Sequence, residues 1–306
     1  MTGNEEILLR ILKQQYALSE DQSKAIIAKI INDYTRRSLP SSHPTLVILG
    51  AQPGAGKTEL QEIAELKLLK NAVVCNADNF RDYHPLAFKI KKEHPKEYPA
   101  ITVEYAHQWN DQLCRYCIEH KLNYILETTF RAGDQLNETI KNAKAKGYQV
   151  DINLLAVNAR LSRLGIHSRY EQMQAKTGLG RMVSRHDHDL RFDAIPYALK
   201  KVQGAKFYDN IYIYARSVVI EGTGNTEGVN LIAHNPDNPL AIYSEEIGRA
   251  WPEKLKLYFE QKYNEVLNLM KNRNAPVKEI EEFSNNVGIR QFQKHRLTKR
   301  RGQRPH

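Results

Sequence analysis

A glycine-rich segment near residue 50 has the residue types and spacing of a phosphate-binding loop. It follows an apolar run and opens an amphipathic stretch, and it reads Gly50-Ala51-Gln52-Pro53-Gly54-Ala55-Gly56-Lys57-Thr58. Glycines let successive backbone N–H groups point at phosphate oxygens, and the helix that follows directs its positive end at the same anion. Lys57 can reach the β- and γ-phosphates, and the Thr58 hydroxyl can ligate Mg²⁺. We therefore predict nucleotide binding by residues 52–58, although Ala51 stands where the strict motif has glycine.

Two carboxylates are expected on the same edge as this loop. Asp78 follows the second strand-like run of the chain, and Glu127 ends the third. In open parallel sheets, ligands bind outside the carboxyl ends of the strands, so both should lie near Lys57. A carboxylate there can take a proton from an acceptor hydroxyl or hold Mg²⁺. The structural alternatives are a helix N-cap for Asp78 and an ion pair with Arg81 or Arg131 for Glu127.

Positive charge over the transferred phosphate is the third requirement of phosphoryl transfer. Six arginines crowd the region after the fourth strand-like run: Arg160, Arg163, Arg169, Arg181, Arg185 and Arg191. A single arginine there is ordinary solvated helix surface, but the cluster suggests a lid or clamp. The loop alone does not distinguish an ATPase, a GTPase and a kinase, and the sequence has no Asn/Thr-Lys-x-Asp motif for reading guanine.

Alternating strands and helices must position these residues. Apolar runs of strand length lie at 45–49, 71–76, 122–127, 149–157 and 210–214. Stretches of helical periodicity lie at 57–69, 102–120, 134–146, 159–175 and 187–203. This alternation predicts an α/β fold with a central parallel sheet of about five strands flanked by helices.

The regions on either side of this alternation suggest four parts of the chain. They are N-terminal helices within 1–40 that pack on the core, a core at 41–240, a helical extension at 241–292 and a basic tail at 293–306. The N-terminal helices are expected at 5–18 and 19–37, with Ser19 as an N-cap. Two β-like runs at 217–221 and 229–233 suggest a hairpin or edge addition, and the extension is expected to form helices at 244–271 and 278–284.

Composition narrows the class of protein. The 306 residues are 41% hydrophobic and 26% charged, and no stretch approaches a transmembrane span, so a cytoplasmic globular protein is expected without a membrane partner. The net charge is +10, but residues 294–306 hold six Lys or Arg and no acid, which leaves +4 for the rest. This body suits an anionic ligand, and the tail could contact nucleic acid weakly. The three cysteines favour core packing over a disulfide framework.

Together these residues resemble the zeta-toxin family of P-loop kinases over about residues 10–215. The matching blocks are Gly50–Thr58, Asn76–Arg81 with His84-Pro85, Glu127-Thr128-Thr129, and Ser168–Glu171 followed by Arg181 and His188-Asp189. Each block is short, and their order and spacing give the combination its specificity.

The resemblance implies a P-loop kinase-like fold and a kinase that phosphorylates UDP-N-acetylglucosamine from ATP with Mg²⁺. It assigns Asp78 as the general base, Lys57 to the phosphates and Thr58 to the metal. Arg169 and Arg181 are implied to stabilise the transferring group. Acceptor binding is implied for Asp78, Arg81, Glu127 and Thr129. The phosphorylated sugar nucleotide would starve peptidoglycan synthesis, and an antitoxin protein is an expected partner.

Two other functions remain open on the sequence. A related P-loop kinase could phosphorylate another acceptor, such as a nicotinamide dinucleotide, an antibiotic or a polynucleotide end. A nucleotide-dependent module that binds nucleic acid or protein could use the basic tail as its working part. The pairing of Asp78 with Glu127 favours an enzyme over the binding module.

Overall fold

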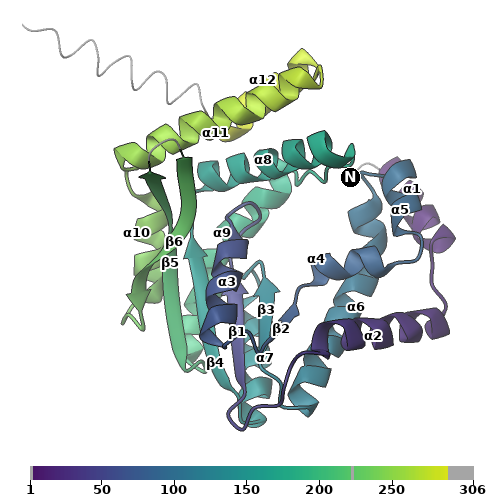
Figure 1. The fold of residues 1–306 in the computed structure, drawn as a ribbon, viewed down its shortest axis with the longest axis vertical. Coiled ribbons are helices and arrows are strands. Elements are labelled where there is room, and N and C mark those ends of the chain that lie inside the picture. Colours follow the sequence, from purple (N-terminus) through teal and green to yellow (C-terminus); the bar gives the residue numbers. More distant parts are fainter. Residues whose placement is uncertain (1–2, 222–223, 289–306) are drawn as a thin grey trace, which may run out of the picture.

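Five parallel strands and one antiparallel strand form a single sheet. The structure is a computed structural model that describes residues 3–221 and 224–288. Its strands are β1 (Thr45–Gly50), β2 (Val73–Cys75), β3 (Tyr124–Thr128), β4 (Gln149–Ala156), β5 (Asn210–Glu221) and β6 (Gly224–His234). They lie in the order β2-β3-β1-β4-β5-β6, with only β6 antiparallel to its neighbour (Figure 1). The α/β class and the parallel core predicted from the sequence are therefore confirmed.

Helices cover both faces of the sheet because the strands are apolar on both sides. Leu46 and Ile48 of β1 point into one core, and Val47 and Leu49 point into the other. The first core is covered by α2 (Glu20–Thr35), α6 (Tyr98–Glu119), α7 (Gly133–Ala145), α9 (Arg185–Ala205) and α10 (Pro239–Gly248). The second is covered by α3 (Lys57–Lys67), α8 (Ala159–Thr177), α11 (Glu253–Asn272) and α12 (Val277–Val287). Such two-sided burial is typical of parallel sheets.

The N-terminal helix packs on a smaller cluster beside the first core. Leu12 of α1 (Gly3–Gln15) and Tyr16, directly after the helix, pack in one cluster with Ile90 of α5 (Ala87–Glu93) and Tyr98 of α6. As expected, Ser19 caps α2, because its hydroxyl accepts the Gln22 N–H in a capping box.

Two expectations for the second half of the chain were wrong in detail. The run at 210–214 and the β-like run at 217–221 are one long strand, β5, which pairs along its length with β6. The helix expected at 244–271 is two helices, because Pro252 lacks an N–H and disfavours helical backbone at the residue before it. α10 ends at Gly248, and α11 starts after Pro252 as its N-cap.

The C-terminal helices lie over α8 and do not stand apart from the core. α11 and α12 contact α8 and contribute Phe259, Met270 and Phe283 to the second core (Figure 1). No helix in the described part of the chain is long and apolar enough to cross a membrane. The basic tail at 293–306 lies outside the described residues.

Candidate active site

The phosphate-binding loop leaves β1 through a crowded turn that explains its glycines. A side chain on Gly50 would overlap Phe130 and Leu154. Gly54 and Gly56 have φ values of 75° and 90°, which side-chain-bearing residues rarely adopt. Ala51 is fully buried and needs no left-handed backbone, so alanine is tolerated at the position where the strict motif has glycine. α3 begins at Lys57, which gives the expected order of strand, loop and helix.

Lys57 lies at the centre of the charged residues. Its Nζ is 3.2 Å from the Ala51 carbonyl oxygen and 3.5 Å from Oε1 of Glu127. Burial lowers the pKa of Lys57, and the negative charge of Glu127 opposes this shift. The charges of Arg169 and Asp78 also act on Lys57. The structure therefore gathers three of the charged residues singled out in the sequence around one ammonium group.

Asp78 follows β2 in the short helix α4 (Ala77–Phe80) and is held by two arginines. Its Oδ1 is 2.9 Å from Nε of Arg81 and 3.1 Å from Nη1 of Arg181. Partial burial would raise the pKa of Asp78, but the charges of Arg181 and Arg81 outweigh it and lower that pKa to about 2. The N-cap of α4 is Asn76, whose side chain accepts the Asp78 N–H. Asp78 is therefore free of the capping role that its position in the sequence also allowed.

Arg81 contacts Asp78 from a mostly buried position. Its side chain is 8% exposed, and Nη1 donates to the Pro99 carbonyl and to the Thr102 hydroxyl. These bonds fix the guanidinium on the α6 side of Asp78. Because Nε and Nη1 both donate inside the protein, these contacts suit a residue that positions Asp78.

Glu127 and Thr129 come from the end of β3. Glu127 pairs in register with Leu49 of β1, which places its carboxylate beside Lys57. Its Oε2 accepts a hydrogen bond of 2.8 Å from Asn76. The ion pairs with Arg81 or Arg131 that the sequence allowed are not among its contacts in the described residues. Thr129 is half-buried directly after the strand.

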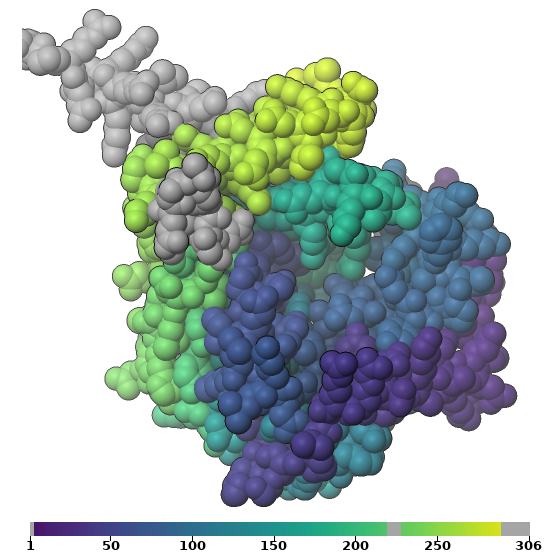
Figure 2. All heavy atoms as spheres, in the orientation of Figure 1, coloured from purple at the N-terminus to yellow at the C-terminus, as the bar shows by residue number. Residues whose placement is uncertain are grey.

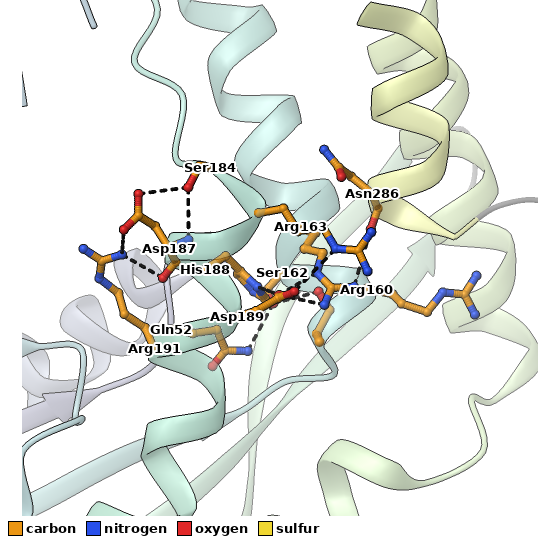
Figure 3. A network of polar contacts seen from close by, with 12 residues as sticks. Gln52, Arg160, Ser162, Arg163, Ser184, Asp187, His188, Asp189, Arg191 and Asn286 are labelled. Carbon is orange, nitrogen blue, oxygen red and sulfur yellow. Dashed lines mark hydrogen bonds and ion pairs between the residues drawn. The ribbon is translucent and has the colours of Figure 1, made fainter. Parts of the chain in front are cut away.

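Only two arginines of the cluster after β4 are directed at the site. The charges of Arg181, Asp78 and Glu127 all act on Arg169, which makes no hydrogen bond or ion pair with the described residues. The others make structural contacts elsewhere (Figure 3). Arg160 donates to the carbonyls of the last residue and the C-cap of α12. Arg163 and Arg185 pair with Asp189, and Arg191 pairs with Asp187.

Arg216 is a residue near the loop that the sequence analysis missed. It lies on β5, pairs with Glu59 at 3.0 Å and is 10% exposed. A side chain on Gly56 would come within 2.4 Å of its Nη1, so the guanidinium lies directly against the phosphate-binding loop. No motif contains this arginine, and its proximity depends on how β5 passes α3.

The loop and its surroundings fit a nucleoside triphosphate with a hydrated magnesium ion. The left-handed glycines and the start of α3 form a backbone cradle for phosphate, and Thr58 is exposed in the first turn of that helix. Mg²⁺ usually keeps several waters and takes one or two protein oxygens beside the phosphates, so a single threonine suits it. Figure 2 shows the surface hollowed below α8, between α3 and the α4–α6 side.

Comparison with known proteins identifies the family. The zeta toxin family model matches residues 29–245. Toxin PezT of Streptococcus pneumoniae is 28% identical over 211 residues, which cover 68% of this chain and 83% of PezT. Toxin zeta of Enterococcus hirae is 26% identical over 212 residues, which cover 69% of this chain and 73% of that toxin. A structure of the S. pneumoniae PezAT toxin–antitoxin system superimposes with a TM-score of 0.70 at 23% identity, covering 83% of this chain and 98% of that chain. The family model spans well over half of the sequence, so the chain belongs to the zeta toxin family and has its P-loop kinase-like fold.

Proposed function

We propose that this protein is an ATP-dependent kinase that phosphorylates a hydroxyl of UDP-N-acetylglucosamine. The observation that carries the proposal is the meeting of Lys57, Asp78 and Arg181 at one edge of the sheet. A phosphate-binding lysine, a carboxylate for the acceptor proton and an arginine for the developing charge are the groups that phosphoryl transfer requires.

In the proposed reaction, the acceptor oxygen attacks the γ-phosphorus of ATP. The Asp78 carboxylate takes the proton of the hydroxyl, the new O–P bond forms, and the bond from the γ-phosphorus to the β–γ bridging oxygen breaks to release ADP. Lys57 and Arg169 hold the phosphates, and Arg181 offsets charge on the transferring group. Mg²⁺, held by Thr58 and the phosphates, would neutralise part of that charge.

The ion pairs of Asp78 suggest how the base is made ready. A carboxylate with a pKa of about 2 is a weak base, because efficient general bases have pKa values near the working pH. We propose that Arg181 leaves Asp78 for the γ-phosphate when ATP binds. The loss of that positive charge raises the pKa of Asp78, and Arg81 keeps the carboxylate aimed at the acceptor.

The acceptor would bind between Asp78 and the end of β3. Glu127 and Thr129 offer a carboxylate and a hydroxyl, which suit the hydroxyl and amide groups of a sugar nucleotide. In the free protein Glu127 contacts Lys57 at 3.5 Å, so nucleotide phosphates that draw Lys57 away would free this carboxylate for the acceptor.

The test is ATP consumption with Mg²⁺ against a panel of acceptors, with products identified by mass. The panel holds UDP-N-acetylglucosamine, other sugar nucleotides, nicotinamide dinucleotides, aminoglycoside antibiotics and oligonucleotide ends. We expect one added phosphoryl group on UDP-N-acetylglucosamine and a loss of about 10²–10⁴-fold in rate for Asp78→Asn. Asp82→Asn is the matched control, because Asp82 lies one turn away and contacts Lys91 and Tyr98 instead. Product on a different acceptor would reassign the substrate, and a full rate for Asp78→Asn would remove the general base.

We also propose that the protein is toxic to the cell that makes it unless an antitoxin protein binds it. The similarity to toxins PezT and zeta supports this proposal. Induced expression should stop growth, and Asp78→Asn should relieve the arrest. Growth arrest by the Asp78→Asn protein would contradict the link between transfer and toxicity.

A further inference from the structure

A buried chain of hydrogen bonds runs from the phosphate-binding loop to the start of α9 (Figure 3). Nε2 of Gln52 donates to the Val157 carbonyl at 2.8 Å and to Oγ of Ser162 at 3.2 Å. Oγ of Ser162 lies 2.7 Å from Nε2 of His188, and Nδ1 of His188 lies 2.7 Å from Oδ1 of Asp189. Gln52, Ser162 and His188 have no exposed surface. Three elements are thus joined through side chains alone.

The chemistry of these groups fixes the direction of every bond. Arg163 donates twice to Oδ1 of Asp189 and keeps it an ionised acceptor, so Nδ1 of His188 carries the proton. Burial lowers the pKa of His188 and keeps the ring neutral, so Nε2 is an acceptor and the Ser162 hydroxyl donates to it. The Ser162 oxygen accepts a hydrogen bond from the side-chain amide of Gln52. The relay therefore runs Gln52 to Ser162 to His188 to Asp189.

This relay has the connectivity of a Ser-His-Asp triad but cannot act as one. A nucleophilic serine must reach a substrate carbonyl beside an oxyanion site. Ser162 and His188 are fully buried, and the oxygen also lies 3.1 Å from the Ala159 carbonyl of its own helix. Hydrolysis is excluded by access, which leaves a positioning role for the buried side chains.

The same face of α8 touches the backbone of the loop. A side chain on Gly165 would come within 2.2 Å of the Gly54 carbonyl oxygen, and one on Gly54 within 2.1 Å of the Ser162 carbonyl oxygen. Both contacts are with backbone, which cannot turn aside. Arg169 follows Gly165 by one helical turn and so lies on the same side of α8. The separation between loop and helix therefore sets how far Arg169 is from Lys57.

We propose that Ser162 and His188 are positioning residues that hold the phosphate-binding loop against α8 through Gln52 and so fix Arg169 relative to Lys57. The inference rests on the proposed function only in that the loop binds ATP. It requires no particular acceptor. The relay also ties the start of α9 to α8, and these helices flank the segment that carries Arg181.

The test measures affinity for a non-hydrolysable ATP analogue with Mg²⁺ by calorimetry, without an acceptor, beside the melting temperature. We expect Ser162→Ala and His188→Phe each to weaken binding about 10-fold, as for loss of a buried hydrogen bond. The double variant should lose little more, because both changes break one relay. His188→Gln, whose amide oxygen can replace Nε2 as the acceptor, should recover most of the affinity. His186→Gln is the control, because His186 is exposed on the same helix.

Labelled-histidine NMR of the unchanged protein tests the relay directly. We expect one histidine ring that is protonated at Nδ1 and unprotonated at Nε2. Its signals should be absent from the spectrum of His188→Phe. An unprotonated Nδ1 in His188 would overturn the inference. So would Ser162→Ala and His188→Phe proteins that fold and bind the ATP analogue with unchanged affinity. If His188→Phe does not fold, Ser162→Ala and the NMR measurement decide. Tight analogue binding without transfer to any acceptor would instead count against the proposed function.

Discussion

The two halves of the candidate site are built from different interactions. On the nucleotide side, the phosphate-binding loop meets α8 through glycine-to-backbone contacts and fully buried side chains. On the acceptor side, Asp78 and Arg181 are joined by an ion pair whose side chains are 54% and 32% exposed. Ion pairs of this exposure are weak and easily exchanged, whereas close backbone contacts between the loop and α8 cannot shift without moving a helix.

This difference indicates which half of the site can change during a reaction cycle. The nucleotide half is already assembled in the free protein and requires little rearrangement to take ATP. The acceptor half holds its base and one arginine against each other, and a negatively charged ligand can separate them. The predictions below test this division from the largest expected effect to the smallest.

Replacing Lys57, in the nucleotide half of the site, should reduce the rate of phosphoryl transfer more than any other change. We expect Lys57→Ala to lower the rate of phosphoryl transfer by at least about 10³-fold, because a positioned cation is lost where negative charge develops. The fold should survive, since Asn76 still holds Glu127. Measured turnover with circular dichroism checks both points, and Lys92→Ala, on the exposed side of α5, is the control. If Lys57→Ala turned over at the wild-type rate, the proposed kinase activity would be refuted.

Removing each arginine should separate the two halves kinetically. We expect Arg181→Ala to lower kcat by about 10²–10³-fold with little change in the KM for ATP, because its charge is needed on the transferring group. Arg169→Ala should mainly raise the KM for ATP, since this arginine belongs to the preassembled half. Equal changes of kcat and KM in both variants would show that the two arginines act together.

A single methyl group should test the contact between the loop and α8. Alanine normally stabilises a helix over glycine by about 0.5–1 kcal/mol, and Gly204→Ala in α9, which has open space around it, should do so. Gly165→Ala should instead destabilise by about 1–3 kcal/mol, because the methyl group meets the Gly54 carbonyl. Urea unfolding of both variants checks this. If Gly165→Ala stabilised the protein, the phosphate-binding loop would be able to move away from α8 at little energetic cost.

The pH dependence of kcat/KM, which reports the free enzyme, should differ from that of kcat, which reports the enzyme with its substrates bound. A pKa of about 2 keeps Asp78 ionised above pH 4, so kcat/KM should show no acidic limb from this group between pH 5 and 8. The acidic limb of kcat should lie at higher pH, because Arg181 has then left the carboxylate. Since the folded pKa lies below its ordinary value of 3.8, the stabilising pairs persist above that pH and are lost as pH falls towards 2. Coincident kcat and kcat/KM profiles would show that Arg181 stays in place.

Truncation after Phe292 should have the smallest effect on catalysis. The removed residues carry six Lys or Arg and little that could join a core, so we expect unchanged kcat and KM. RNA binding, followed by salt titration, should weaken and lose part of its salt dependence. Faster turnover would reveal autoinhibition by the tail, and loss of turnover would reveal a substrate-binding element.

The placement of the candidate residues at one edge of the sheet could be predicted from the sequence, whereas their contacts could not. The loop at 50–58 and the carboxylates Asp78 and Glu127 could be placed because parallel strands bring their carboxyl ends to one edge. Which arginines point inward could not be predicted, because spacing alone does not show which face of α8 is covered. Arg160 was expected in the clamp and instead binds the end of α12, 127 residues away.

Long-range geometry explains the remaining misses. The runs at 210–214 and 217–221 look like two strands in the sequence, whereas the structure joins them in β5, which pairs with β6 across a register irregularity between Ile213 and Tyr214. Arg216 reaches the loop only because β5 passes beside α3. His188 was noted only as part of a motif, and its role depends on a tertiary contact with Ser162 that no local pattern encodes.

The packing of α11 against α8 has a consequence for how the protein folds as it is synthesised. Glu171 on α8 is 1% exposed, and its carboxylate is bound at 2.8 Å by two nitrogens of Arg273. Glu171 is made 102 residues before this arginine, so α8 cannot bury its carboxylate as half of an ion pair until α11 is complete. The helix that carries Arg169 therefore gains this support only once α11 has been made, and fragments that end before Arg273 lack the ion pair.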